Sequence, residues 1–128
     1  LAARSLAAGE SRRQLALRDQ LEHRLATLLP GRVHLNGHPV QRLPNTANLR
    51  IDDAPALALL ADLTDVVVSA GSACHAGRDE PSAVLTAMGR SDADALTAIR
   101  VSLGRWTTAA EVDAACTHLA GATRTDHP

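Results

Sequence analysis

Leucine recurs through the first thirty residues at the spacing of one helical face. It occupies positions 17, 21, 25 and 28, and steps of three and four residues place these side chains in a single stripe. Pro30 and Gly31 follow directly, and both residue types stop a helix. The pattern therefore predicts one long amphipathic helix over residues 1–29, with its leucine stripe turned toward a core.

Four later segments have the composition and the length of β-strands. The first three cover residues 33–35, 46–51 and 66–69, and Asn36-Gly37 forms a turn after the first. In the fourth, residues 98–103, apolar and polar side chains alternate, which predicts one buried face and one polar face. The expected buried face carries Ile99, Val101 and Leu103, and the polar face carries Arg100 and Ser102.

Helix start signals lie between these strands. Asp53 can cap a helix that has Pro55 just inside its start. Residues 79–81 open a second helix, which stops near Gly89, and residues 91–94 start a short third one. The side chains expected on the buried face of the first of these helices are Leu57, Leu60 and Leu63.

The last predicted helix follows Thr108, which has the spacing of a capping box with Glu111. Its apolar face carries Val112, Cys116 and Leu119. The residues after Gly121 are polar, and chain ends of this kind are commonly frayed.

The predicted elements together indicate the fold class. Their order is a helix, two strands, a helix, a strand, two short helices, a strand and a helix. In a chain of 128 residues without internal repeats, this order predicts an α/β fold built as a small two-layer sandwich. We expect one domain over residues 1–120 and a polar tail over residues 121–128.

Charge and cysteine usage narrow the range of functions. The formal net charge is −1, and the arginines are scattered apart from Arg12-Arg13, so no nucleic-acid partner is expected. The apolar runs are far shorter than the roughly 20 residues of a membrane span, so no membrane partner is expected. Two cysteines without a C-x-x-C motif indicate a reducing compartment, and the predicted location is cytoplasmic.

The two cysteines lie in different sequence environments. Cys116 belongs to the apolar face of a helix, where a free cysteine acts as a small hydrophobic residue. Cys74 follows a predicted strand and lies between Gly71 and Gly77. It is either a catalytic or redox thiol, activated by neighbours such as His75, or a plain exposed loop thiol. One thiol and one adjacent histidine supply at most two ligands, so no metal site is predicted.

Three side chains near the fourth strand are further candidates. Arg100 lies on the polar face, where a guanidinium can bind a carboxylate through two parallel hydrogen bonds or form a structural ion pair. Trp106, the only tryptophan, either shapes a pocket or packs into the core. Arg105 is expected to be solvated or part of an interface.

Lysine is absent from the chain, and all thirteen basic residues are arginine. A carbonyl cofactor is held covalently by a lysine amine. This polypeptide therefore has no side chain that can form such a Schiff base.

Four ordered motifs carry a family resemblance that covers nearly the whole chain. They are Leu-Pro-Asn-Thr-Ala-Asn-Leu at 43–49, Ser-Ala-Gly-Ser-Ala-Cys at 69–74, Glu-Pro-Ser-Ala-Val-Leu-Thr-Ala-Met-Gly at 80–89 and Ile-Arg-Val-Ser-Leu-Gly-Arg-Trp-Thr-Thr at 99–108. In this order and at these separations they resemble the C-terminal small domain of NifS- and IscS-type cysteine desulfurases. That family belongs to the class V aminotransferases among the fold-type I pyridoxal phosphate enzymes.

The resemblance implies a sulfurtransferase that takes sulfur from L-cysteine, releases L-alanine and holds the sulfur as a persulfide for iron-sulfur cluster or other sulfur-cofactor assembly. It assigns persulfide formation to Cys74 and binding of the substrate carboxylate to Arg100. The implied cofactor is pyridoxal 5'-phosphate, whose lysine and phosphate-binding groups belong to a large domain that this chain lacks. The implied partners are that large domain, a second copy in a homodimer, and a sulfur-acceptor or iron-sulfur scaffold protein.

Other functions remain open at this point. Segments 33–36, 41–46 and 73–75 also resemble selenocysteine lyases, so the substrate is either L-cysteine or L-selenocysteine. A stand-alone, non-enzymatic sulfur-relay or interaction module would use Cys74 to accept persulfide from a partner. A truncated remnant would keep the fold without activity.

Overall fold

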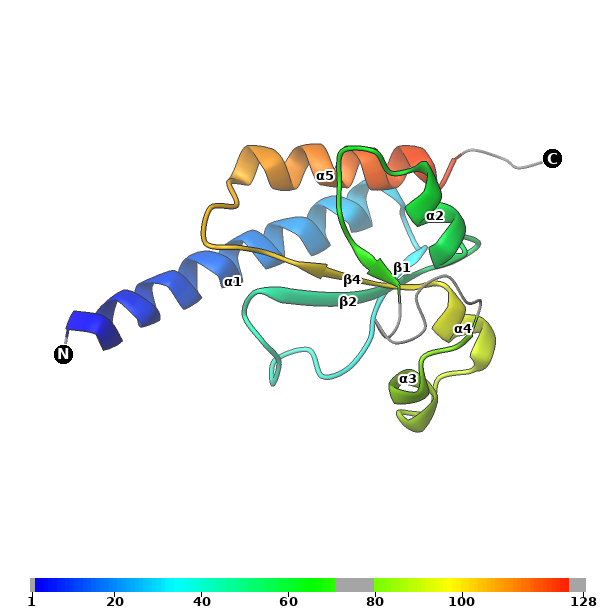
Figure 1. The fold of residues 1–128 in the computed structure, drawn as a ribbon, viewed down its shortest axis with the longest axis horizontal. Helices are drawn as coiled ribbons and strands as arrows, with labels where there is room; N and C mark the ends of the chain where they lie inside the picture. The colour runs from blue at the N-terminus through cyan, green and yellow to red at the C-terminus, as the bar shows by residue number, and fades with distance from the viewer. Residues whose placement is uncertain (1, 71–79, 125–128) are drawn as a thin grey trace.

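The computed structural model describes residues 2–70 and 80–124 and has two main layers (Figure 1). One layer is a four-stranded sheet. The other consists of the long helix α1 (Ala2–Leu28), the last helix α5 (Ala109–Ala122) and the short helix α2 (Ala56–Asp62), which lie on the same face of the sheet. This arrangement confirms the predicted two-layer α/β fold.

The sheet contains β1 (Val33–Leu35), β2 (Thr46–Ile51), β3 (Ser69–Ala70) and β4 (Ala98–Ser102). Its strand order is β1-β2-β4-β3, and every neighbouring pair is antiparallel. The central pair is the longest, because β2 and β4 stay in register over five residue positions, from Thr46 opposite Ser102 to Arg50 opposite Ala98. Residues of the fourth sequence motif thus lie in the middle of the sheet.

Two short helices, α3 (Ala83–Ala87) and α4 (Asp92–Leu96), lie on the other side of the sheet from α1 and α5 (Figure 1). Each begins at a serine whose hydroxyl accepts a hydrogen bond from a backbone N–H three residues on, Ser82 for α3 and Ser91 for α4. Leu85, Ala95 and Ala98 form a small apolar cluster between these helices and β4.

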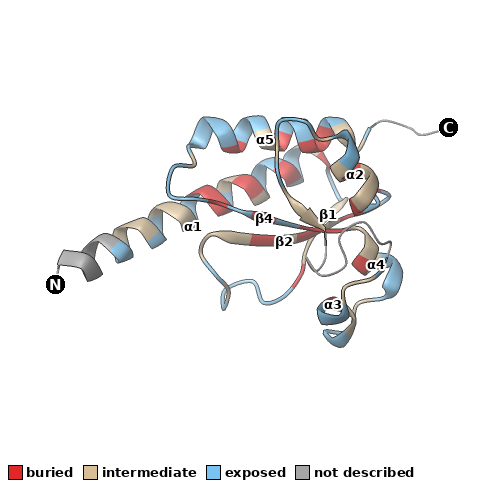
Figure 2. Cartoon of the chain, viewed as in Figure 1, coloured by how far each residue is buried: buried red, intermediate tan, exposed pale blue. Residues whose placement is uncertain are grey.

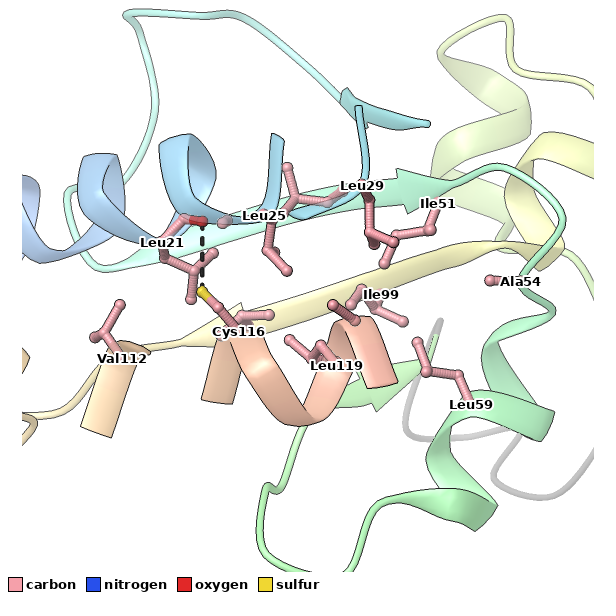
Figure 3. Packing of buried hydrophobic residues seen from close by; sticks show 14 of the residues in the cluster. Leu21, Leu25, Leu29, Ile51, Ala54, Leu59, Ile99, Val112, Cys116 and Leu119 are labelled. Atoms are coloured by element: carbon pink, nitrogen blue, oxygen red, sulfur yellow. Dashed lines mark hydrogen bonds between the residues drawn. The ribbon is translucent and has the colours of Figure 1, made fainter. Parts of the chain in front are cut away.

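The main core lies between the helices and the sheet (Figures 2 and 3). Leu17, Leu21 and Leu25 of α1 are buried, as the spacing predicts, whereas Leu28 is partly buried and Leu29, just after the helix, is buried instead. The buried face of α5 packs in the same core. Complete removal of such side chains from water contributes roughly 1.5–3 kcal/mol each. The largest fully buried side chains are Leu21, Leu25, Leu49, Ile51, Ile99, Val112, Cys116 and Leu119.

Several sequence predictions are confirmed residue by residue. Strands at 33–35 and 46–51 have the predicted bounds, and in β4 the apolar and polar faces divide as expected. The capping box of α5 is complete, because the Thr108 and Glu111 side chains each bond to the other's backbone N–H. α5 ends at Ala122, one residue beyond the predicted start of the tail, and residues 125–128 lie outside the described residues.

The predicted strand at 66–69 is wrong except for its last residue. The strand that forms is Ser69–Ala70, whereas Val66, Val67 and Val68 precede it outside the sheet, and Val67 is 99% exposed. A β-branched triplet favours a strand only where it can pack on neighbours. Here β3 meets β4 only at Arg100 and Ile99, so the triplet has no pairing partner.

The predicted starts of two helices are also corrected. α2 begins after Pro55 without a side-chain cap, and Asp53 has a left-handed backbone (φ +58°) instead of capping the helix. The fully buried side chains of α2 are Ala56 and Leu59, whereas the predicted Leu60 and Leu63 are partly buried against the core. α3 begins later than predicted, because Ser82 caps it. Asp79 itself lies outside the described residues.

Candidate functional site: the polar face of the sheet

A row of polar residues crosses the face of the sheet opposite α1 and α5. Asn48 on β2 is directly opposite Arg100 on β4, and Arg100 is directly opposite Ser69 on β3. Asn36 extends the row beyond β1, since its backbone N–H donates to the Asn48 carbonyl over 2.9 Å. Directly opposite residues of antiparallel strands point to the same face, with Cβ atoms roughly 4.5–5.5 Å apart. We call Asn36, Asn48, Arg100 and Ser69 the polar row.

Arg100 is the only charged member of the polar row, and its side chain is exposed. No acidic side chain within residues 2–70 and 80–124 forms an ion pair with it. Arg50 lies on the same face and differs in this respect, because its Nε is 3.6 Å from Asp94 and 3.9 Å from Asp52. The structural ion pair considered for Arg100 is therefore not formed in this part of the chain.

The two asparagines of the row are joined through their side chains. Asn36 Nδ2 donates to Asn48 Oδ1 over 2.9 Å. Asn36 is only 8% exposed, and its own Oδ1 has no hydrogen-bond partner among the described residues. A buried amide oxygen without a partner is rare in a folded protein and calls for an explanation.

Cys74, together with His75, lies outside the described residues. The strand that precedes it is described, however, and Ala70 at the end of β3 is paired with Ile99. Because Ser69, one residue earlier, is opposite Arg100, the chain enters the segment that contains Cys74 from the end of the polar row.

Comparison with known proteins gives relatives of one kind. A cysteine desulfurase of Frankia sp. (strain EuIK1) is 46% identical over 112 residues, and the cysteine desulfurase IscS of Azotobacter vinelandii (strain DJ) is 41% identical over 111. These matches cover 88% and 87% of the chain but 27% of each relative, so the chain spans about a quarter of their length. No family model matches the chain.

Solved structures agree with the sequence relatives. A NifS-like protein from Rickettsia africae matches with a TM-score of 0.72 and 29% identity, over 88% of this chain and 28% of that one. Another NifS-like protein matches with a TM-score of 0.73 and 26% identity, over 89% and 28%. The chain is a homologue of the C-terminal domain of cysteine desulfurases.

In this cysteine desulfurase domain, Cys116 has the structural role expected from the sequence. It is fully buried on α5, and its thiol donates to the Leu21 carbonyl of α1 over 3.6 Å (Figure 3). Burial, with a smaller contribution from the Asp113 charge, raises the pKa of the Cys116 thiol to about 11. A thiol that stays protonated at neutral pH is a poor nucleophile.

Trp106 borders a groove instead of packing into the core of the desulfurase domain. It is 82% exposed, and the Arg105 guanidinium lies 5.1 Å from the centre of its ring, so the packing interpretation is wrong. The groove has a volume of about 440 Å³. It runs between α5, the end of β4 and Asp65–Val67, in the segment that connects α2 to β3.

Arg13 holds the turn between β4 and α5, a role that the sequence did not indicate. From α1 its guanidinium donates to the carbonyls of Gly104, Arg105 and Thr107, at 3.2, 2.7 and 2.7 Å, and it pairs with Glu10 at 2.8 Å. The hydrogen bonds from Arg13 lower the pKa of Glu10. In the sequence, the adjacent Arg12 and Arg13 were the only indication of a basic site on this helix. They do not show which groups Arg13 contacts.

Among residues 2–70 and 80–124, no three His, Cys, Asp or Glu side chains gather in positions to hold a metal ion. No helix in the part of the chain that the structure describes is long and apolar enough to cross a membrane.

Proposed function

We propose that this chain is the C-terminal part of a pyridoxal phosphate-dependent cysteine desulfurase. In this proposal Cys74 receives sulfur from L-cysteine, and Arg100 binds the carboxylate of that substrate. The observation that carries the proposal is the position of Arg100. It lies exposed on a central strand, on the face of the sheet opposite α1 and α5, without a carboxylate partner among the described residues, and it is adjacent to the strand that leads to Cys74.

A guanidinium on a rigid strand, with no carboxylate partner among the described residues, is well suited to orient an amino acid. Its planar fork can donate two parallel hydrogen bonds to a carboxylate, and the paired strands on both sides of β4 fix its backbone. Cys74 follows Ala70 by four positions in the sequence, and four peptide steps span at most about 14 Å. This short connection favours the proposal that Cys74 and Arg100 serve one site.

The sulfur transfer balances without an external oxidant. The bond between the substrate carbon and its sulfur breaks, and a bond forms between that sulfur and Sγ of Cys74. The carbon is reduced and gains a proton, which gives L-alanine, while the two sulfur atoms are oxidised to the persulfide level. Cys74 attacks as a thiolate, because the thiolate is the nucleophilic form of cysteine.

Pyridoxal phosphate fits the whole enzyme but not this chain alone. The cofactor supplies the electron sink for breaking the carbon–sulfur bond when it is bound. The chain has no lysine, so the covalent link to the cofactor must come from the rest of a longer protein. Within the domain, the polar row contributes to the substrate side of the site.

The partners follow from the same proposal. They are the large domain of the enzyme, a second copy in a homodimer, and a sulfur-acceptor or iron-sulfur scaffold protein that takes the persulfide sulfur. The relatives named above are called cysteine desulfurases, which favours L-cysteine over L-selenocysteine as the substrate. The predicted location is cytoplasmic.

Cys74→Ser in the full-length enzyme tests the proposal. With L-cysteine, the wild-type protein is expected to gain sulfur at Cys74, detected as a mass increase of the tryptic peptide, and to release alanine. The serine variant should bind L-cysteine but carry no persulfide, because a hydroxyl is a far weaker sulfur acceptor. Cys116→Ala is the matched control and should keep the persulfide yield. Full persulfide formation by Cys74→Ser would overturn the assignment.

A further inference from the structure

The two asparagines of the polar row are not explained by the roles proposed for Cys74 and Arg100. They hydrogen-bond to each other on the face of the sheet opposite α1 and α5, and Asn36 leaves a buried amide oxygen without a partner among the described residues. A buried polar atom without a hydrogen-bond partner lowers the stability of the fold, so its presence calls for an explanation. The polar row is also the place where the proposed substrate carboxylate would lie.

We propose that Asn48 donates a hydrogen bond to the carboxylate that Arg100 binds, and that Asn36 is the positioning residue that orients the Asn48 amide. This inference rests on the proposed function, because it specifies how the same carboxylate is bound. It adds two residues of this chain to the substrate site.

The orientation of the Asn48 amide follows from its neighbours. β2 lies between β1 and β4, so Asn36 and Arg100 flank Asn48 on opposite sides. The Oδ1 atom accepts from Asn36 Nδ2 on the β1 side. The NH2 group is the other arm of the same amide, so we infer that it lies on the side away from Asn36, and it has no hydrogen-bond partner among the described residues. It is therefore available as a donor beside the Arg100 guanidinium.

The carboxylate has room for this additional donor. Its two oxygens offer about four lone-pair sites, and a bidentate arginine uses two of them. Directly opposite Cβ atoms lie roughly 5 Å apart, so a carboxylate held by Arg100 can reach the Asn48 amide. A neutral donor also suits this position, since a second cation next to Arg100 would be repelled by it.

Asn36 acts through Asn48. It is 8% exposed and held by two hydrogen bonds to Asn48, one from its backbone N–H and one from Nδ2, each 2.9 Å long. A buried side chain fixed at both ends has little freedom to rotate. It keeps Asn48 Oδ1 occupied and so prevents the Asn48 amide from turning its oxygen toward the carboxylate.

Ligand binding to the full-length enzyme tests this assignment. L-alanine and ethylamine differ by the carboxylate alone, and calorimetry gives the dissociation constant of each. Asn48→Ala is expected to weaken L-alanine binding about tenfold, the effect of roughly one hydrogen bond to a charged group, and to leave ethylamine binding unchanged. Asn48→Asp should weaken L-alanine binding more, because a second carboxylate repels the ligand. Thr46→Ala, on the same strand and face, should change neither constant.

The role of Asn36 is tested by a double-mutant cycle. Asn36→Ala alone is expected to weaken L-alanine binding, and it should add nothing in an Asn48→Ala background, because it acts only through that amide. Circular dichroism melting confirms that each variant is folded. Normal L-alanine binding by folded Asn48→Ala or Asn48→Asp would overturn the proposal, as would equal, independent losses in the cycle. If the wild type binds L-alanine through Asn48 but releases no sulfur from cysteine, the proposed function fails while this site stands.

Discussion

Neighbours decide what each arginine in this domain can do. Arg50 and Arg100 occupy adjacent strands and the same face of the sheet, but carboxylates lie next to Arg50 and none of the described ones pairs with Arg100. The alternation along residues 98–103 was enough to place Arg100 on a polar face, because it depends only on the strand period. That no described carboxylate pairs with Arg100 could not be predicted, because the acidic residues that could pair with it come from other segments of the chain.

Arg100→Ala in the full-length enzyme should raise KM for L-cysteine and lower kcat/KM. The loss expected is roughly 1.5–3 kcal/mol, the size of a hydrogen bond to a charged group. Steady-state kinetics measure it, and Arg50→Ala, on the same face but ion-paired, serves as the comparison. Unchanged kcat/KM in Arg100→Ala would remove this residue from the site.

Cys116 should resist alkylation in the folded protein at pH 8. Its pKa is raised to about 11 from an ordinary value near 9.0, so almost no thiolate forms, and its side chain is buried. A brief, limiting dose of iodoacetamide followed by peptide mapping should label Cys74 first and Cys116 only after unfolding. Because the folded-state pKa is the higher one, ionisation of Cys116 opposes folding only as the pH rises from about 9 through about 11. Equal labelling of both thiols in a folded sample would contradict this.

For helices and strands, the sequence predicted the structure well where the pattern involves only residues close together in the chain. The leucine stripe of α1 and the capping box of α5 need only side chains a few residues apart, and both are present as predicted. The segment 66–69 needed a pairing partner from elsewhere, and propensity alone could not supply it. The contact of α1 with the β4–α5 turn depends on the packing of distant elements and had no local signal.

The Arg13 contact should give the stability of the domain an acid-sensitive component. The pKa of Glu10 is lowered in the folded state, so the ionised carboxylate supports folding above its ordinary value near 4.5, and this support is lost as the pH falls through the lowered pKa. The melting temperature should fall on acidification below about pH 4.5, and less steeply in Glu10→Gln.

A substitution of Arg13, the ion-pair partner of Glu10, allows a second measurement of the same contact. Arg13→Gln should speed hydrogen exchange at the turn formed by residues 104–107, whose carbonyls it holds. The adjacent Arg12→Gln is the control and should leave exchange there unchanged. If the melting temperatures of the wild type and Glu10→Gln depended on pH in the same way, the ion pair would not contribute to the stability of the domain.

At the scale of the whole molecule, α1 is an integral part of the domain and not an appended helix. Its leucines pack against both α5 and the sheet (Figure 3). The two-layer fold and the family could be predicted from the sequence, because periodicity and ordered motifs are preserved over most of the chain. The asparagine pair of the polar row could not, since it depends on the register between β1 and β2.

Leu25→Ala should therefore destabilise the entire fold. Its side chain is fully buried between α1, α5 and the sheet, and deletions of this kind cost about 2–5 kcal/mol. Leu15→Ala, on the same helix but 39% exposed, should cost less than about 0.5 kcal/mol. Urea denaturation followed by circular dichroism measures both. Similar midpoints for the two variants would mean that α1 does not contribute to the cooperative core.

The exclusion of Val66–Val68 from the sheet has a practical consequence for the solubility of the protein. β3 pairs with β4 only at Ile99 and Arg100, so beyond Arg100 the β3 side of β4, where the backbone of Ser102 faces, has no strand partner among the described residues. An uncovered strand edge is a template on which another polypeptide can add in β conformation. Concentrated solutions of the separate domain are thus prone to edge-to-edge aggregation, and a charged residue in place of Val67 is the substitution that would improve its solubility.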